Sequence, residues 1–389
     1  MKHHPNMAGR SKFLCAWTMV ALMACAPLAH TGGLEGVQMA TDDRLQLPGW
    51  WPTKGTASRA EFAGSETCAQ CHSQKARTQP HTPMANASTR AADSAALRSH
   101  PQLTFSLPPF TYQIAHKENG AVYSVSNGRN TASAPLGWAF GLGEAGQTYI
   151  FQRAGTFYES RLSYYRALDG LDFTPGAPRT PSSTVEDALG RRMLYSGETR
   201  RCFGCHNTAS TVSSRFDPSR MIPGVTCEAC HGPGAKHAAL MKAGQSEAGL
   251  ASILNPARLN PADLVDFCGA CHRTFMDVGL SRTFGILNLR FQPYRLERSR
   301  CWKNDPLITC LTCHDPHMPR VRDLAAYNDK CLGCHGSGAA SAHRPPKSCS
   351  ASASSCVSCH MPKYDMPGMH FKFTDHFIRI VRDGDSYVD

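Results

Sequence analysis

The stretch CLTCHDPHMPRVRDLAAYNDKCLGCHG, residues 310–336, holds two copies of the pattern C-x-x-C-H and one further histidine, His317, just after the first copy. The pattern recurs five more times, giving seven copies in 389 residues, where random placement would give about 0.04. Numbered along the chain as motifs 1 to 7, the copies are Cys68-Cys71-His72, Cys202-Cys205-His206, Cys227-Cys230-His231, Cys268-Cys271-His272, Cys310-Cys313-His314, Cys331-Cys334-His335 and Cys356-Cys359-His360.

The spacing within each motif suits covalent haem attachment. Two thiols three residues apart on a helical turn can add to both vinyl groups of one haem, and the next histidine then becomes the proximal iron ligand. Zinc is the competing interpretation, but it needs four ligands from two pairs and gives no role to a histidine after every pair. The sequence therefore predicts seven haem c groups on 14 of the 18 cysteines, with zinc or disulfides as the alternatives.

The formal net charge of +11 at first suggests a nucleic-acid or membrane-surface partner. Seven haems would bring fourteen propionates, whose negative charge would outweigh this excess. The chain also has no basic run interleaved with aromatic residues. We therefore expect no nucleic-acid partner.

The N-terminus predicts export. A basic start precedes the apolar run FLCAWTMVALMACAPLA, residues 13–29, so residues 1–29 are typical of a secretory signal peptide. The quartet Leu22-Met23-Ala24-Cys25 also resembles a lipoprotein box, in which Cys25 would carry a lipid anchor; ordinary cleavage is the alternative. The expected location is the periplasm, outer membrane or cell surface of a bacterium.

Histidines outside the motifs are candidates for the distal side of each iron. Two histidine ligands favour lower reduction potentials than one histidine and one methionine. His116 lies in a predicted β-hairpin, and an exposed strand position is favoured for it; His100, before Pro101, is a weaker candidate. The candidate distal ligands are His81, His237, His317, His343, His370 and His376. A seventh haem would then take Met84, Met361, Met366, His100 or water.

His317 follows the proximal His314 by only three residues. So short a chain cannot travel round the porphyrin to the opposite face of the same haem. If His317 binds iron, it binds the iron of a neighbouring haem. The same argument applies to His237, six residues after His231. Such histidines would link one haem to the next.

The spacing of the motifs divides the chain into segments. After the signal peptide, residues 30–60 are interpreted as a linker and residues 61–101 as a first haem segment. Residues 102–175 contain no motif but alternate like strands, which predicts a small antiparallel insertion between haems 1 and 2. Residues 176–389 carry six motifs with short segments between them, so we expect a mainly α fold with long loops around stacked haems. The two cysteines outside both the motifs and the signal peptide, Cys301 and Cys349, are predicted to form a disulfide, with free or metal-binding thiols as the alternatives.

Several phrases go beyond bare haem motifs, namely FAGSETCAQCH (62–72), CHGPGAKH (230–237) and MPGMHFKFTDH (366–376). With them, residues 62–380 resemble the multihaem c-type cytochromes grouped around the tetrahaem cytochrome that accepts electrons from hydroxylamine oxidoreductase. The resemblance implies a mainly helical, haem-stacked fold and electron transfer outside the cytoplasm. It also implies His237, His370 and His376 as iron ligands.

The function expected from these features is electron transfer between periplasmic or membrane-associated partners, either redox proteins or a quinone-linked membrane oxidoreductase. No catalytic residue is predicted. The alternative is a multihaem oxidoreductase that acts on a small nitrogen or sulfur compound at one five-coordinate haem.

Overall fold

A computed structural model describes residues 57–118, 120–193, 196–212, 215–219, 221–304, 308–335, 355–382 and 384–389. All of them belong to one unit, Gln38–Asp389. The predicted signal peptide, Cys25 and the linker as far as residue 56 lie outside the described residues.

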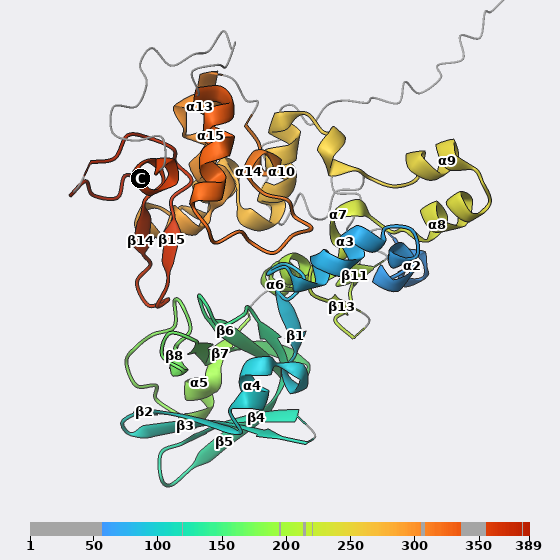
Figure 1. The fold of residues 1–389 in the computed structure, drawn as a ribbon. Coiled ribbons are helices and arrows are strands. Elements are labelled where there is room, and N and C mark those ends of the chain that lie inside the picture. The colour runs from blue at the N-terminus through green and yellow to red at the C-terminus, as the bar shows by residue number, and fades with distance from the viewer. Residues whose placement is uncertain are drawn as a thin grey trace, which may run out of the picture. The chain divides into compact units, whose positions relative to one another are not determined.

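The largest element is a nine-stranded antiparallel sheet (Figure 1). Seven strands follow one another in chain order from β2 to β8, while β1 pairs with β5 and β9 pairs with β7. The strands are β1 (Ser88–Arg90), β2 (Gln102–Leu107), β3 (Phe110–Lys117), β4 (Gly120–Ser126), β5 (Thr131–Phe140), β6 (Gln147–Arg153), β7 (Thr156–Tyr165), β8 (Gly170–Phe173) and β9 (Gly190–Arg192).

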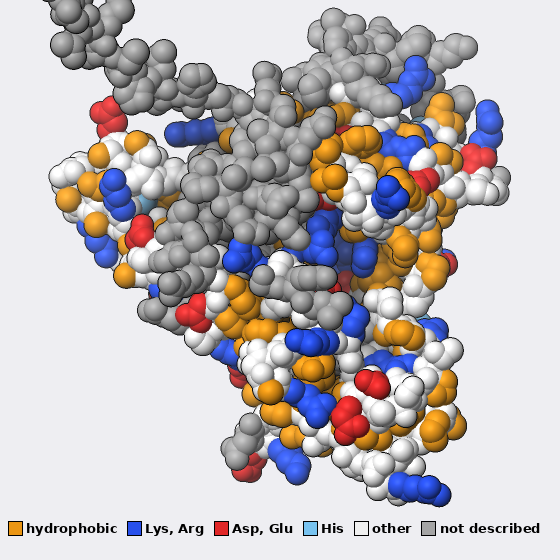
Figure 2. All heavy atoms as spheres, turned by 180° about the vertical axis from the view of Figure 1, so that it is seen from behind, with side chains coloured by type: hydrophobic (Ala, Val, Ile, Leu, Met, Phe, Trp, Pro, Cys, Tyr) orange, Lys and Arg blue, Asp and Glu red, His pale blue; other side chains and the backbone are white. Residues whose placement is uncertain are grey.

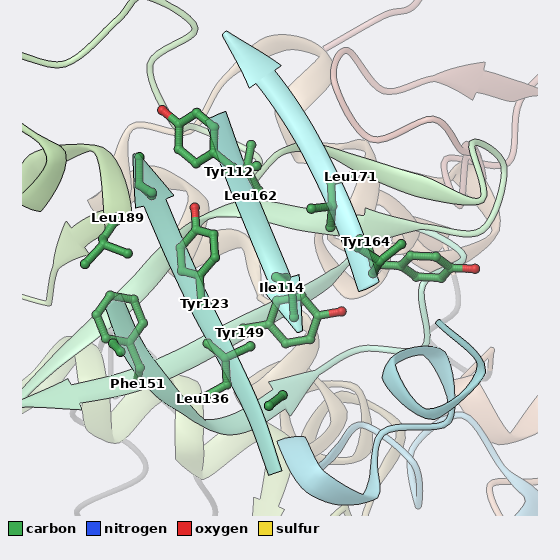
Figure 3. Packing of buried hydrophobic residues seen from close by; sticks show 14 of the residues in the cluster. Tyr112, Ile114, Tyr123, Leu136, Tyr149, Phe151, Leu162, Tyr164, Leu171 and Leu189 are labelled. Atoms are coloured by element: carbon green, nitrogen blue, oxygen red, sulfur yellow. The ribbon is translucent and has the colours of Figure 1, made fainter. Parts of the chain in front are cut away.

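The alternation of side chains along these strands produces the main hydrophobic core. Tyr112 and Ile114 of β3 point to one side together with Tyr123 of β4, and all three are almost fully buried. Ile114 lies opposite Tyr123 in the register of the two strands. Figure 3 shows these residues packed with others from β5, β6 and β7. The core therefore lies on one face of the sheet, as period-2 patterning requires.

The sheet curls so that its first and last strands in the β2 to β8 series approach each other. The ring of Phe105 in β2 meets the ring of Phe173 in β8 edge-on at 5.3 Å. Register shifts between Leu136 and Trp138 on β5 and between Thr148 and Ile150 on β6 accompany this curvature. Bulges of this kind increase the local twist of a strand.

The expectation of a mainly α chain with a small insertion is wrong. The sheet uses residues 88–192, extends beyond 102–175 at both ends, and contains the largest buried cluster among the described residues. The fold is a mixture of a large antiparallel sheet and a helical region. The sequence did not predict the short strands β1 and β9, because three residues are too few to show the alternation of a strand.

The helical region begins with α2 and α3 before the sheet and continues after it (Figure 1). Its helices are short, with four to twelve residues each. They are α2 (Ser65–Ala69), α3 (Ser73–Thr78), α6 (Ser196–His206), α7 (Cys227–His231), α8 (Ala235–Lys242), α9 (Ser246–Ala251), α10 (Pro261–His272), α11 (Phe275–Ser281), α12 (Gln292–Glu297), α13 (Arg300–Asn304), α14 (Cys310–Cys313), α15 (Asn328–His335) and α16 (Cys356–His360). Two further helices, α4 (Ala95–Ser99) and α5 (Val185–Leu189), pack on the sheet.

The remaining elements are short. They are the 3₁₀ helices η1 (Arg59–Glu61), η2 (Gln79–His81), η3 (Ala91–Asp93), η4 (Pro256–Arg258), η5 (Gly285–Arg290) and η6 (Ala325–Tyr327), and the paired strands β10 (Asn207–Thr208) with β13 (Ile222–Pro223), β11 (Thr211–Val212) with β12 (Arg215–Phe216), and β14 (Lys363–Asp365) with β15 (Lys372–Thr374).

One aromatic cluster joins the sheet to the first helix after it. Phe203 of α6 is fully buried and meets Trp138 and Phe140 of β5 edge-on, at 5.1 and 5.0 Å between ring centres. Edge-on packing is a favourable arrangement for aromatic rings. Motif 2 is therefore attached to the sheet through its own helix.

Apolar clusters in the helical region are small. One consists of Phe267 and Ala270 with cysteines of three motifs around them, and another of Leu289, Met366 and Met369 with a few partly buried neighbours. Short helices with so little buried apolar surface of their own need another source of apolar contact. Covalently bound porphyrin would supply it.

No helix among the described residues is long and apolar enough to cross a membrane. On the face drawn in Figure 2, Lys and Arg side chains lie interspersed with hydrophobic ones and are more prominent than Asp and Glu. This matches the basic balance of the sequence.

We predict that Leu162→Ala lowers the free energy of unfolding of the sheet by about 2–5 kcal/mol, because Leu162 of β7 is fully buried and its removal leaves a cavity. Leu168→Ala, in the turn after β7, is the control: this side chain is 48% exposed, and the change should stay within about 0.5 kcal/mol. Urea unfolding followed by circular dichroism measures both. Equal effects of the two substitutions would contradict the assignment of the core.

Candidate haem sites

All seven motifs adopt the helical turn that haem attachment requires. In motif 1, the His72 N–H donates to the Cys68 carbonyl at 2.9 Å, and in motif 5 the His314 N–H donates to Cys310 at the same distance. The other five motifs lie within helices α6, α7, α10, α15 and α16, each of which ends at the motif histidine. Side chains three residues apart on a helix share a face, so each pair of thiols points to one side.

The motifs lie against one another in pairs. The thiols of Cys68, the first cysteine of motif 1, and Cys227, the first cysteine of motif 3, lie close enough for their interaction to raise the pKa of Cys68 and lower that of Cys227. The same contact joins Cys268 of motif 4 to Cys310 of motif 5. It also joins Cys331 of motif 6 to Cys356 of motif 7. Each contact brings two attachment sites together.

Further contacts connect these pairs. Cys230 of motif 3 and Cys205 of motif 2 both pack on the Phe267–Ala270 cluster of motif 4, and the Cys205 thiol lies 3.7 Å from the Ala270 carbonyl. Cys313 of motif 5 lies within electrostatic reach of Cys331 of motif 6. The motifs therefore form a continuous series in the order 1, 3, 4, 5, 6 and 7, with motif 2 beside motif 4.

Three motif histidines face a second histidine. The ring centres are 6.4 Å apart for His72 and His237, 6.0 Å for His231 and His317, and 6.4 Å for His314 and His376. Two metal–nitrogen bonds of about 2 Å, with about 1 Å from each nitrogen to its ring centre, give about 6 Å. The separations match two imidazoles on opposite sides of one metal ion.

In four of these six histidines the other ring nitrogen is held by a hydrogen bond. The Nδ1 atom of His231 donates to the Leu254 carbonyl, that of His237 to the Gly249 carbonyl and that of His376 to the Thr374 carbonyl, at 2.8 to 3.1 Å. In His317 the Nδ1 partner is the carboxylate of Asp315, at 2.8 Å. Such partners fix the tautomer and leave Nε2 for a metal. Two further motif histidines have the same anchor, His206 on the Ala87 carbonyl and His360 on that of Arg379.

Burial keeps some of these imidazoles neutral. Burial, together with the neighbouring His314, lowers the pKa of His376 to about 4. It also lowers the pKa of His231 and of His314. Only the neutral imidazole has a lone pair for iron, so the electrostatics of the sites suit metal binding. The turns, the ring separations and the anchored Nδ1 atoms together fit haem c.

The remaining candidate ligands lie elsewhere. His81 is exposed in η2, and His343 lies outside the described residues. His370 has its Nε2 2.8 Å from the Asp172 carboxylate, and its ring edge packs on Tyr165. Among the described residues, neither His81 nor His370 faces a motif histidine.

Two other histidines use Nε2 for protein contacts. His100 hydrogen-bonds through Nδ1 to the Ala96 carbonyl and through Nε2 to Asp169, while Nε2 of His116 on β3 meets the Ala92 carbonyl. Both are therefore held by the sheet region.

The alternative ligands and the predicted disulfide remain predictions. Met366 is buried in the cluster with Leu289 and Met369, while Met84 and Met361 are half-buried. Cys301 is a free thiol, and its predicted partner Cys349 lies outside the described residues.

A buried ion pair that the sequence did not suggest supports His376. Arg295 of α12 donates to both carboxylate oxygens of Asp375 at 2.8 and 2.9 Å, and neither side chain is exposed. Burial alone would raise the pKa of Asp375, but the bonds from Arg295 and from the Phe377 N–H hold it below its usual value. The pair fixes the backbone next to His376. A single arginine in a helix gives no sequence signal of such a partner 80 residues away.

We predict that His237→Ala, His317→Ala and His376→Ala each convert one low-spin iron to a ligand-accessible one, so that carbon monoxide binding to the reduced protein rises by about one equivalent per chain. Low-spin EPR signals of the oxidised protein should fall in parallel. His100→Ala is the matched control and should change neither quantity. Unchanged spectra in the first three variants would contradict the pairing.

We also predict that Asp375→Ala lowers the free energy of unfolding by about 3–5 kcal/mol, because it leaves the buried Arg295 charge unpaired. Asp365→Ala removes an exposed pair with Lys372 in the neighbouring hairpin and should cost less than about 1 kcal/mol. Thermal unfolding of the two variants measures the difference. A cost for Asp375→Ala as small as that of the control would contradict the role of the buried pair.

One family model agrees with the chemistry of these motifs. Residues 181–232, which include motifs 2 and 3, match the family model for cytochrome c554 and c-prime. No curated protein matches the chain. A solved structure, the outer cell wall cytochrome OcwA, shares 15% identity over 82% of this chain and 80% of its own, with a TM-score of 0.47, which is a loose likeness. The chain therefore combines seven C-x-x-C-H motifs with a segment, residues 181–232, that is similar to the cytochrome c554 and c-prime family.

Proposed function

We propose that this chain is an exported heptahaem cytochrome that carries electrons between periplasmic or membrane-associated redox partners. The observation that supports this most strongly is the set of three histidine pairs, because each pair joins two different motifs. His237 follows motif 3 but faces motif 1; His317 follows motif 5 but faces motif 3; His376 follows motif 7 but faces motif 5.

In this proposal the chain holds one haem c at each motif, through two thioether bonds and the motif histidine. Bound haem c supplies one-electron oxidation and reduction at its iron. His237, His317 and His376 would supply the second histidine ligand to the haems held at motifs 1, 3 and 5. Their hydrogen-bonded Nδ1 atoms keep the rings in one orientation, so the ligands need not move when the charge changes.

The contacts between motifs support a route for electrons along the array. First cysteines interact within the pairs of motifs 1 and 3, 4 and 5, and 6 and 7, while the second cysteines of motifs 3 and 5 interact with the first cysteines of motifs 4 and 6. Motif 2, held on the sheet by Phe203, lies to the side of motif 4. We propose motifs 1 and 7 as the ends of the route.

The location and partners follow from the sequence. The apolar N-terminal run and its basic start support export to the periplasm or cell surface. The partners proposed are redox proteins or a quinone-linked membrane oxidoreductase. Lipidation of Cys25 would place the protein at a membrane.

We predict seven covalently bound haems by mass spectrometry of the purified protein. In the same sample, EPR of the oxidised form should show low-spin iron at motifs 1, 3 and 5. Fewer than seven haems, or high-spin iron at these three sites, would contradict the proposal. If the protein turned over nitrite, hydroxylamine or sulfite and carbon monoxide blocked this activity, the protein would be a multihaem oxidoreductase and not an electron carrier.

A further inference from the structure

One acidic side chain, in motif 3, connects that motif to the segment before motif 1 and to the segment after motif 3. Glu228 lies between the two cysteines of motif 3 and is only 1% exposed. Its Oε1 accepts hydrogen bonds from the N–H groups of Ala63 at 2.7 Å and Gly234 at 2.8 Å, and its Oε2 accepts one from Gly64 at 2.9 Å. Three donors around one buried carboxylate satisfy it without a cation.

The donors belong to the segments that carry both ligands of the motif 1 iron. Gly64 is the N-cap of α2, four residues before Cys68, and Gly234 is the N-cap of α8, three residues before His237. A carboxylate at a helix N-terminus is favourable, because the free N–H groups and the helix dipole both attract negative charge. Glu228 therefore fixes the start of α2, which leads to His72, and the start of α8, which carries His237.

The carboxylate also acts at the attachment sites. Glu228 directly follows Cys227 in the chain, and its bonds to the Ala63 and Gly64 N–H groups hold the turn that leads to Cys68, so its negative charge lies close to motifs 1 and 3 together. A buried anion near an iron stabilises the ferric state relative to the ferrous state, because the ferric iron has the larger positive charge.

We propose that Glu228 is a positioning residue that sets the separation between His72 and His237 across the motif 1 iron and biases the motif 1 and motif 3 irons toward the ferric state. This inference rests on the proposed haem ligation. It adds that one carboxylate, contributed by motif 3, builds the ligand geometry of motif 1.

The test uses the full mature protein with its haems attached. In Glu228→Gln the amide nitrogen faces a backbone N–H donor, so one hydrogen bond is lost and the charge is removed. We expect loss of the same low-spin EPR signal that His237→Ala removes. We also expect a rise in the reduced-to-oxidised ratio of these irons of at least about threefold at a fixed potential. Glu66→Gln, on the exposed face of α2, is the control and should leave both readouts unchanged.

Two further variants separate geometry from charge. Glu228→Asp keeps the charge but is too short to reach both segments, so it should disturb the EPR signal while the reduced-to-oxidised ratio changes less than in Glu228→Gln. Gly234→Ala keeps every hydrogen-bonding group but brings a methyl group to 3.2 Å from the Glu228 Oε1 atom, and it should shift the same EPR signal. Gly279→Ala, whose new methyl group meets nothing within 4 Å, is its control.

The outcomes distinguish this inference from the proposed function. If His237→Ala itself leaves the EPR spectrum unchanged, the ligation fails and the inference with it. If His237→Ala removes a low-spin signal but Glu228→Gln, with seven haems attached, changes neither readout, the inference alone is overturned. If the Glu228 variants do not mature, Gly234→Ala decides: a spectrum identical to that of the parent overturns the role of the carboxylate.

Discussion

The helical region depends on histidines that reach from one motif to another. A ligand from the same motif cannot pass round the porphyrin, so the second imidazole must come from another segment. The ring centres of His237, His317 and His376 lie 6.0 to 6.4 Å from the ring centres of motif histidines in other segments. Each such pair closes a loop between distant parts of the chain. Iron bound between the rings would hold these loops, and short helices that could not pack alone would become one array.

The chain thus combines two kinds of stabilisation. The sheet has a conventional core of aromatic and aliphatic side chains, including Tyr123 and Leu162, and needs no cofactor to bury them. The motif helices have small clusters such as Phe267 with Ala270, and polar anchors at their ends. Glu228 and the Arg295–Asp375 pair are two such anchors, both buried and both next to segments that bear the proposed iron ligands. In the helical region, buried polar contacts and bound haem would together supply the stabilisation that apolar packing supplies in the sheet.

Local pattern predicted part of this arrangement. The motifs could be read directly, because attachment chemistry fixes the spacing of Cys, Cys and His. The size of a porphyrin and the short chain after each motif predict that His237 and His317 reach a neighbouring motif. The structure places both beside histidines of other motifs. The extent of the sheet could not be read, since edge strands such as Ser88–Arg90 are defined by pairing with distant residues. For the same reason His370, in a phrase that resembles a haem cytochrome family, gave no sign of its contact with Asp172. Partners far apart in sequence leave no periodicity.

The most direct test of the account is the position of the irons. Anomalous X-ray diffraction at the iron absorption edge, from crystals of the mature protein, would locate each iron independently of the chain trace. The account predicts seven iron positions, three of them midway between His72 and His237, His231 and His317, and His314 and His376. An iron coordinated at one of these motif histidines without the facing histidine as its second ligand would contradict it.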